Sequence, residues 1–279
     1  MPLDLLVVSS ETPDQQDSRR RRSGQASHET YADALHQLAP DAGISHRCCV
    51  DGTSSPEPAA LRRHDGVLFA GSPIQMHEKT VETRAAAAFM HAVYESGVPA
   101  FGSCAGLQIA AVAAGGAAAP RDSGMEAGFA RGIVATDAGR THPMLRCRPL
   151  SWNAPAMHST VVERLPSGAT LLARSDGTHA QAAEIRVGKG VFWGVQYHPE
   201  LALWEIGDAL RAQADALMET GLAQDEEAVA RYAGALDALH DNSGRDDLAW
   251  QLGLDAEVTD PQRRRREISN FLAFIAERV

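Results

Sequence analysis

The sequence predicts an α/β protein in which a mostly parallel sheet carries helices on both faces, with an all-helical extension at the C-terminal end. Up to about residue 114, short apolar runs alternate with segments of helical spacing. From residue 128 to 195 the apolar runs are short and separated by turn residues, and after residue 200 the strand pattern ends. Alternating strands and helices favour parallel pairing, because a crossover helix joins parallel strands. We expect one domain over residues 1–202 and a helical extension over residues 203–279.

Composition and charge limit the kinds of function that the protein can have. The chain has 279 residues, of which 44% are hydrophobic, and this is enough for a sizeable core. With 36 acidic against 26 basic residues its formal net charge is −10, so nucleic acid is not an expected partner. No apolar run approaches the roughly 18 residues of a membrane span, and we expect a cytoplasmic protein. The four cysteines form no CxxC pair, and we expect neither a metal nor a cofactor.

The N-terminal elements follow from apolar spacing. Leu3 to Val8 is an apolar run that predicts a buried strand, and the polar residues after it predict a long loop through Gln25. The next helix is predicted where apolar residues recur at helical spacing, at Tyr31, Leu35 and Leu38.

A second group of elements surrounds two further strands. Gly66 to Ala70 and Val98 to Phe101 are short apolar runs that predict buried strands. Residues 79–96 are rich in alanine and contain neither Gly nor Pro, so we expect a helix there. A further alanine-rich helix is expected to end at about Ala114.

The middle of the chain predicts short strands. Gly188-Lys189-Gly190 is typical of a hairpin turn. The predicted strands are Gly128 to Thr136, Ala169 to Arg174, Ala180 to Val187 and Gly190 to Val195.

The extension predicts three amphipathic helices. Their apolar stripes must be buried, so we expect the extension to pack on the domain or to form an oligomer interface. The stripes are Leu203, Ile206, Leu210, Ala214 and Leu217 in one helix, then Val229, Tyr232, Leu236 and Leu239, and last Ile268, Phe271, Leu272 and Ile275.

The sharpest local signal is the pattern G-x-C-x-G at residues 102–106, between a predicted strand and a predicted helix. Flanking glycines permit a tight turn that exposes the residue between them. Cys104 would then lie at a helix N-terminus, where the dipole favours the thiolate and free N–H groups can bind an oxyanion. The alternative is that Cys104 is a small apolar core residue.

A cysteine nucleophile needs a base and an acceptor that orients the base. His198-Pro199-Glu200 supplies both directly after a predicted strand, and the proline stiffens the backbone between them. Taken alone, this tripeptide is also typical of a surface turn.

Together these motifs resemble a known family. Residues 101–108 (FGSCAGLQ) and 194–200 (GVQYHPE) resemble the two signatures of class I glutamine amidotransferases, in the same order and separation. Two weaker blocks, residues 68–73 and 157–162, resemble the family's oxyanion loop and the segment that binds the main chain of glutamine. The resemblance spans residues 1–202 and implies a flavodoxin-like domain.

The resemblance also implies the chemistry and the site. Cys104 would attack the side-chain amide of glutamine, His198 would protonate the departing ammonia, and water would release glutamate from a γ-glutamyl thioester. Glu200 would orient His198. The residues implied for the oxyanion and the substrate are Gly71, Ser72, Ala105, Gln108, His158 and Ser159.

Two features depart from the family pattern. The oxyanion loop has Ser72 where the family has a second small residue, and a positive φ there would cost roughly 1 kcal/mol or more. Such strain would leave the loop incomplete until substrate or a partner binds. Residues 12–27, with Arg19 to Arg22, form a longer first loop than the family core needs. This loop is either a solvated charged segment or a lid or partner contact at the edge of the sheet.

Three functions remain open. In the first, the chain hydrolyses glutamine and delivers ammonia to a synthetase. The synthetase would be a separate subunit, because the sequence has no GxxxxGK[ST] loop for binding a nucleotide. In the second, it is a self-contained hydrolase of γ-glutamyl amides larger than glutamine. In the third, it is a non-catalytic binding module, although binding alone does not require Cys104, His198 and Glu200 together.

Overall fold

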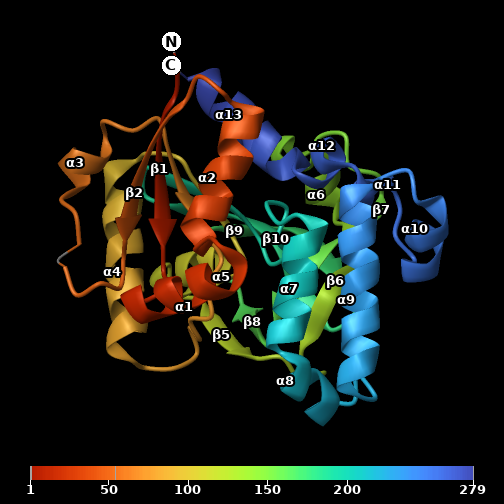
Figure 1. Ribbon diagram of the computed structural model, residues 1–279. Helices are drawn as coiled ribbons and strands as arrows, with labels where there is room; N and C mark the ends of the chain where they lie inside the picture. Colours follow the sequence, from red (N-terminus) through yellow and green to blue (C-terminus); the bar gives the residue numbers. More distant parts are fainter. Residues whose placement is uncertain (1, 54, 279) are drawn as a thin grey trace.

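The computed structural model describes residues 2–53 and 55–278, and its centre is a nine-stranded sheet (Figure 1). The parallel part consists of β2, β1, β3, β4 and β11, and β10, β9, β6 and β7 continue it in antiparallel order. The spatial order is β2 (Gly43–Cys48), β1 (Asp4–Ser9), β3 (Gly66–Phe69), β4 (Ala100–Ser103), β11 (Gly190–Val195), β10 (Thr178–Val187), β9 (Ala169–Ser175), β6 (Glu126–Ala135) and β7 (Ser151–His158).

Side chains of β1 alternate between two hydrophobic layers, as the period of a strand requires. Leu6 and Val8 pack in the layer that contains α4 (Val81–Ser96) and α5 (Ala105–Ala113). Leu5 and Val7 pack in the opposite layer, which contains α2 (Ser27–Leu38) and α13 (Arg266–Ala276). The sheet is therefore covered by helices on both faces, and the predicted fold class is confirmed.

No strand is predicted from the sequence at the positions of β5 (Ala117–Pro120), β7 and β8 (Thr160–Arg164). β5 and β8 form a separate antiparallel pair, and β7 closes the edge of the large sheet. β5 is mostly alanine and β7 contains Pro155, so neither has the β-branched alternation by which strands are recognised.

The predicted long first loop is wrong, because residues 13–23 form the helix α1 (Pro13–Ser23). Thr12 and Gln15 make a reciprocal capping box, with Gln15 N donating to Thr12 Oγ1 at 3.3 Å and Thr12 N donating to Gln15 Oε1 at 2.9 Å. Pro13 is the first helical residue, and Gly24 ends the helix with a φ of 83°. These start and stop signals are in the sequence, but α1 lacks the apolar stripe on which the prediction depended.

The extension also differs in detail from the prediction. The single helix expected through Leu217 is two helices, because the backbone at Gln213 leaves helical geometry with φ −116° and ψ 22°. The helices after β11 are α7 (Leu203–Ala212), α8 (Ala214–Glu219), α9 (Glu226–Asp241), α10 (Asp246–Leu252), α11 (Ala256–Thr259), α12 (Pro261–Arg264) and α13. Elsewhere the chain forms the short helices α3 (Pro58–Leu61) and α6 (Asp137–Thr141) and a 3₁₀ turn at Pro143–Leu145.

The extension contacts the sheet at two places. α7 and α9 share a hydrophobic cluster with Phe129 of β6. α13 packs against the parallel strands and places Glu267 beside Arg148, with Nε–Oε1 2.7 Å and both side chains almost fully buried. Tyr197, close to the end of β11, donates its hydroxyl to the same carboxylate at 2.8 Å. None of the described helices is both long enough and apolar enough to cross a membrane.

Candidate active site

The candidate site lies at the edge of the sheet where the parallel strands end. The loops after β3, β4 and β11 carry Gly71, Cys104 and His198, and all three line a cavity of about 400 Å³. In open α/β sheets, ligands bind at the carboxyl ends of the strands, where such loops meet. The topology of the sheet therefore brings together residues that are far apart in the sequence.

Cys104 stands on the predicted tight turn between β4 and α5. Its backbone has φ 50° and ψ −104°, a strained conformation for a residue with a side chain, and its N–H donates to Val195 O at 2.7 Å. A Cβ on Gly106 would lie 2.9 Å from the Cβ of Phe69, so only glycine permits this close approach of helix and strand. Cys104 is 5% exposed and lines the cavity, in the geometry expected of an elbow nucleophile.

His198 lies between Cys104 and Glu200. Its Nδ1 is 2.8 Å from Glu200 Oε1, and the ring lines the same cavity as Cys104. Burial opposes the charged imidazolium, but the charges of Glu200 and Cys104 prevail and raise the pKa of His198 to about 10. A Cβ on Gly71 would lie 2.4 Å from His198 Cε1, so the glycine leaves room for the ring. The arrangement can move a proton between the sulfur and a group in the cavity.

Ser72 does not have the backbone strain that a positive φ would impose. Among the described residues other than glycine, positive φ values occur at Cys104 and Cys147. Instead, the Ser72 and Ser10 hydroxyls are hydrogen-bonded at 2.7 Å, which ties the loop after β3 to the end of β1. The expectation of backbone strain at Ser72 is therefore wrong.

The other residues implied for oxyanion and substrate binding surround the nucleophile. Gln108, His158 and Ser159 line the cavity, and Ala105 begins α5 directly after Cys104. His158 Nε2 is 2.9 Å from Glu126 Oε2, and Gln181 Nε2 donates to the same oxygen at 3.0 Å. This carboxylate holds the His158 ring at the cavity wall.

Gln196 is a residue at the site that the sequence interpretation missed. Its Nε2 is 3.5 Å from Cys104 Sγ, and its Oε1 accepts from Gln108 Nε2 at 3.3 Å. The signal was present in the sequence, because Gln196 lies within the motif of residues 194–200 that also contains His198 and Glu200.

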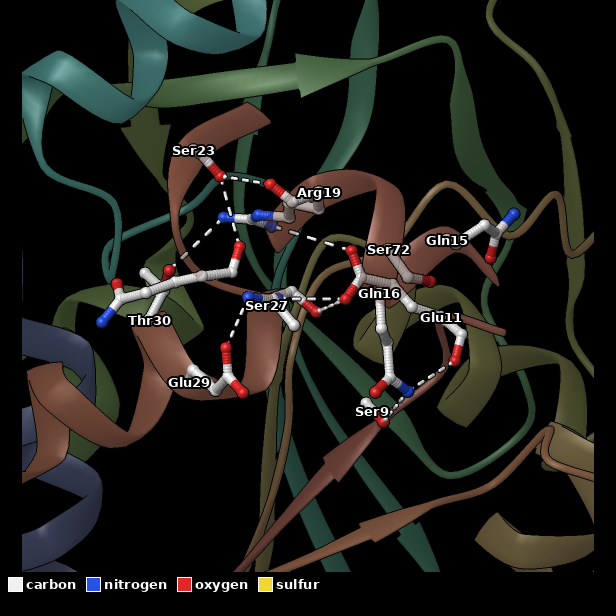
Figure 2. A network of polar contacts seen from close by, with 12 residues as sticks. Ser9, Glu11, Gln15, Gln16, Arg19, Ser23, Ser27, Glu29, Thr30 and Ser72 are labelled. Atoms are coloured by element: carbon white, nitrogen blue, oxygen red, sulfur yellow. Dashed lines mark hydrogen bonds and ion pairs between the residues drawn. The ribbon is translucent and has the colours of Figure 1, made fainter. Parts of the chain in front are cut away.

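Helix α1 forms the outer wall of the cavity. Its Arg19 lies between two buried carboxylates. Arg19 Nη1 is 3.9 Å from Glu11 Oε1 (Figure 2), and Nη2 is 3.5 Å from Glu205 Oε1 of α7. Glu11 Oε2 in turn accepts from Ser27 N at 3.0 Å and from Ser27 Oγ at 2.6 Å, at the start of α2. The segment expected as a loop is therefore a helix fixed to α2 and α7, with Arg19 directed at the centre of this network.

A second ion pair joins α1 to α7 at the rim of the cavity. Arg22 Nε is 2.9 Å from Asp208 Oδ2, and both residues line the cavity. Within the described part of the chain, no group of three or more His, Cys, Asp or Glu side chains is arranged to hold a metal ion.

The comparisons with known proteins agree with this geometry. Residues 35–214 match the family "Glutamine amidotransferase class-I". A gamma-glutamyl-L-1-hydroxyisopropylamide hydrolase from a Pseudomonas species is 40% identical over 164 residues, which make up 58% of this chain and 55% of that protein. A glutamine-hydrolysing GMP synthase from Leifsonia xyli is 30% identical over 161 residues, 58% of this chain and 31% of that enzyme.

Solved structures share the whole fold. A glutamine amidotransferase from Thermotoga maritima has a TM-score of 0.64 at 15% identity, and the match covers 97% of this chain and 99% of that one. By contrast, the chain spans about half of the curated hydrolase and about a third of the curated synthase. The family match covers more than half of the chain and includes Cys104, His198 and Glu200, and the chain belongs to the class-I glutamine amidotransferase family.

Proposed function

We propose that this protein hydrolyses γ-glutamyl side-chain amides through a thioester on Cys104, and that it acts as a self-contained hydrolase on amides larger than glutamine. One observation carries the proposed action on amides larger than glutamine. The cavity around Cys104 and His198 continues outward between α1 and α7, so this chain itself builds the space beside the nucleophile.

The first half of the reaction forms the thioester. The Cys104 thiolate attacks the amide carbonyl carbon, and the N–H groups at the start of α5 stabilise the negative charge that forms on the oxygen. The carbon–nitrogen bond then breaks, and His198 gives its proton to the departing amine. Glu200 accepts a hydrogen bond from Nδ1 of the ring and so keeps Nε2 available for this transfer.

The second half consumes water. Water attacks the thioester carbon, His198 accepts one of its protons, and the carbon–sulfur bond breaks to release glutamate. The thiolate and the imidazolium of His198 are then present again, and the cycle is balanced in atoms and charge. Apart from the substrate and water, both halves of the reaction use only groups of this chain.

The space beyond the nucleophile supports a leaving group larger than ammonia. Beside the charged residues Arg19, Arg22, Glu205 and Asp208, the α1 and α7 side chains that line it are polar and uncharged or small, among them Gln15, Ser18, Ala209 and Ala212. Polar uncharged groups and methyl groups suit a short amine with both aliphatic carbon and a hydrogen-bonding group. The similar hydrolase of Pseudomonas is named for an amide of this kind, and this also supports the proposal.

A second candidate function is glutamine hydrolysis that delivers ammonia to a synthetase on another chain. The similarity to glutamine-hydrolysing GMP synthases supports it, because those enzymes have such a domain attached to more than twice its length of other sequence. In this case the wall formed by α1 and α7 would have to open toward the partner.

Steady-state release of glutamate by the isolated protein distinguishes the proposed hydrolase from a glutaminase that delivers ammonia to a synthetase. Substrates would be glutamine, γ-glutamylmethylamide and a γ-glutamyl amide of a short amino alcohol, with Cys104→Ala as the inactive control. We expect kcat/KM to be at least tenfold higher for the larger amides than for glutamine. Preference for glutamine, with slow turnover that a synthetase, ATP and an acceptor increase, would instead support ammonia delivery.

A further inference from the structure

Two buried glutamines connect the substrate cavity to the nucleophilic sulfur. Gln108 of α5 and Gln196 after β11 are 2% and 0% exposed, and their side-chain amides are hydrogen-bonded to each other at 3.3 Å. Gln196 Nε2 lies 3.5 Å from Cys104 Sγ. The canonical Cys–His–Glu chemistry described above does not use this connection.

The orientation of both amides follows from a single backbone group. Gln108 Nε2 donates to Thr160 O at 2.9 Å, and a carbonyl oxygen can only accept. The group of Gln108 that faces Thr160 is therefore its NH₂, and the same nitrogen faces Gln196. Gln196 must then present its oxygen to Gln108 and its own NH₂ to the sulfur, because the reverse orientation would place nitrogen against nitrogen.

An N–H donor directed at a sulfur stabilises the thiolate more than the thiol. A hydrogen bond to a charged acceptor is stronger than one between neutral groups, and burial strengthens it further. Gln196 itself is held in place, since its backbone N–H donates to Gln181 O at 2.9 Å. The Gln196 amide is thus a hydrogen-bond donor that contacts the sulfur of Cys104.

We propose that Gln196 is a further catalytic residue, which orients the Cys104 sulfur and stabilises its thiolate, and that Gln108 is a positioning residue which acts through Gln196. The proposal rests on the proposed role of Cys104 as the nucleophile. Gln108 Oε1 is buried without a hydrogen-bond partner among the described residues, and Gln108 lines the cavity. A substrate N–H bound there would polarise the Gln108 amide and so strengthen both hydrogen bonds toward the sulfur.

The test measures the reactivity of Cys104 without any substrate. Wild type and Gln196→Met would be alkylated with iodoacetamide between pH 4 and 10, and peptide mapping by mass spectrometry would follow Cys104 alone. Methionine keeps the side-chain volume and removes the donor. We expect the pH midpoint of alkylation to rise by about one unit, which makes the reaction about tenfold slower below the midpoint.

Three further variants make the test specific. Gln196→Glu is nearly isosteric, and it should raise the pH midpoint of alkylation further, because its carboxylate repels the thiolate. If the methionine variant does not fold, Gln196→Glu tests the role of Gln196 in its place. Gln181→Met is the matched control, a buried glutamine whose amide donates to Glu126 and Ser175, and its midpoint should equal that of wild type. Gln108→Met should shift the midpoint by less than Gln196→Met, and the double variant by no more than Gln196→Met alone.

The outcomes separate this proposal from the proposed function. Unchanged midpoints in folded Gln196→Met and Gln196→Glu would overturn the role of Gln196, even if Cys104 is the reactive cysteine. A wild-type Cys104 that iodoacetamide does not modify selectively would overturn the proposed nucleophile itself. A shift in Gln181→Met as large as in Gln196→Met would show a general effect of packing and would also overturn the role of Gln196.

Discussion

At the scale of single residues, the site depends on short contacts that each hold one functional atom. Glu200 holds one nitrogen of His198 at 2.8 Å, and the strained backbone of Cys104 points its sulfur into the cavity. The pKa of His198 is raised to about 10 once the carboxylate and the sulfur outweigh the cost of burial. The ring is therefore positively charged at neutral pH and can act as the acid for the leaving amine.

The base and its orienting acid should differ in importance. We expect His198→Ala to lower kcat by about 10³-fold, because proton transfer to the leaving amine is lost. Glu200→Gln should lower kcat by about 10- to 100-fold, since the amide can still orient the ring while the charge is removed. Steady-state kcat on the preferred amide measures both. Equal losses would mean that Glu200 does more than orient the imidazole.

Ser72→Gly should not activate the isolated protein. A positive φ would have predicted activation through relief of strain, but Ser72 is not among the described residues with positive φ. The substitution instead removes the hydrogen bond to Ser10, and such a bond stabilises a protein by about 0.5–1.5 kcal/mol. We expect an unchanged or slightly lower kcat together with a lower Tm. A severalfold increase in kcat would indicate that the loop is held in an inactive conformation.

At the scale of secondary-structure elements, α1 decides the shape of the cavity beyond the nucleophile. Its own ends are well determined by the Thr12 capping box and by Gly24, but its place in the fold depends on contacts with α2 and α7. Arg19 makes those contacts from the centre of the helix, and Arg22 makes one at the rim. The wall at the leaving-group side is therefore held by charged groups and not by an apolar core.

Arg19→Met should loosen this wall. Glu11 and Glu205 would lose their cationic neighbour while staying buried, so we expect a Tm lower by several degrees. KM for amides larger than glutamine should rise severalfold, whereas KM for glutamine should change less, because only the larger amides reach α1. Arg21→Met is the matched control, since Arg21 is exposed on the same helix. Equal increases in KM for glutamine and for the larger amides would contradict a role of α1 in binding the leaving group.

At the scale of the whole molecule, the extension completes the core instead of standing apart from it. Ile268, Phe271 and Ile275 of α13 lie in the same hydrophobic layer as β1 and α2. The buried pair of Arg148 and Glu267 joins the antiparallel half of the chain to the same helix. Leu5 and Val7 of β1 belong to this layer too, so α13 covers the first strand.

Deletion of residues 260–279 should therefore destabilise the protein. Each large apolar side chain of α13 that becomes exposed or lost removes roughly 1.5–3 kcal/mol of stabilisation, and Arg148 would stay buried without its carboxylate. We expect aggregation or a strongly lowered Tm, measured by differential scanning fluorimetry and size-exclusion chromatography. A soluble truncated protein with unchanged Tm would show that α13 is an accessory to the fold.

Much of this protein was predictable because its strongest constraints are local. The glycines around Cys104 permit the turn on which the residue stands, and His198-Pro199-Glu200 places a base and an acceptor two residues apart. The alternation of apolar runs and helical spacing was sufficient for the class of fold, because a buried strand and a half-buried helix each impose their own period. These features need no knowledge of distant residues.

The rest of the fold and of the site was decided by contacts between residues far apart in the chain. Arg19 and Glu205 are 186 positions apart, yet their ion pair makes α1 a wall of the cavity and not a solvated loop. Gln196 acquires its contact with the sulfur only when β4 and β11 lie side by side. The sequence by itself determined the turn that carries Cys104, the short spacing of His198 and Glu200 and the class of fold, since these follow from backbone sterics and periodicity. The tertiary structure decided what surrounds the reacting atoms, since charge pairing and burial depend on which elements meet.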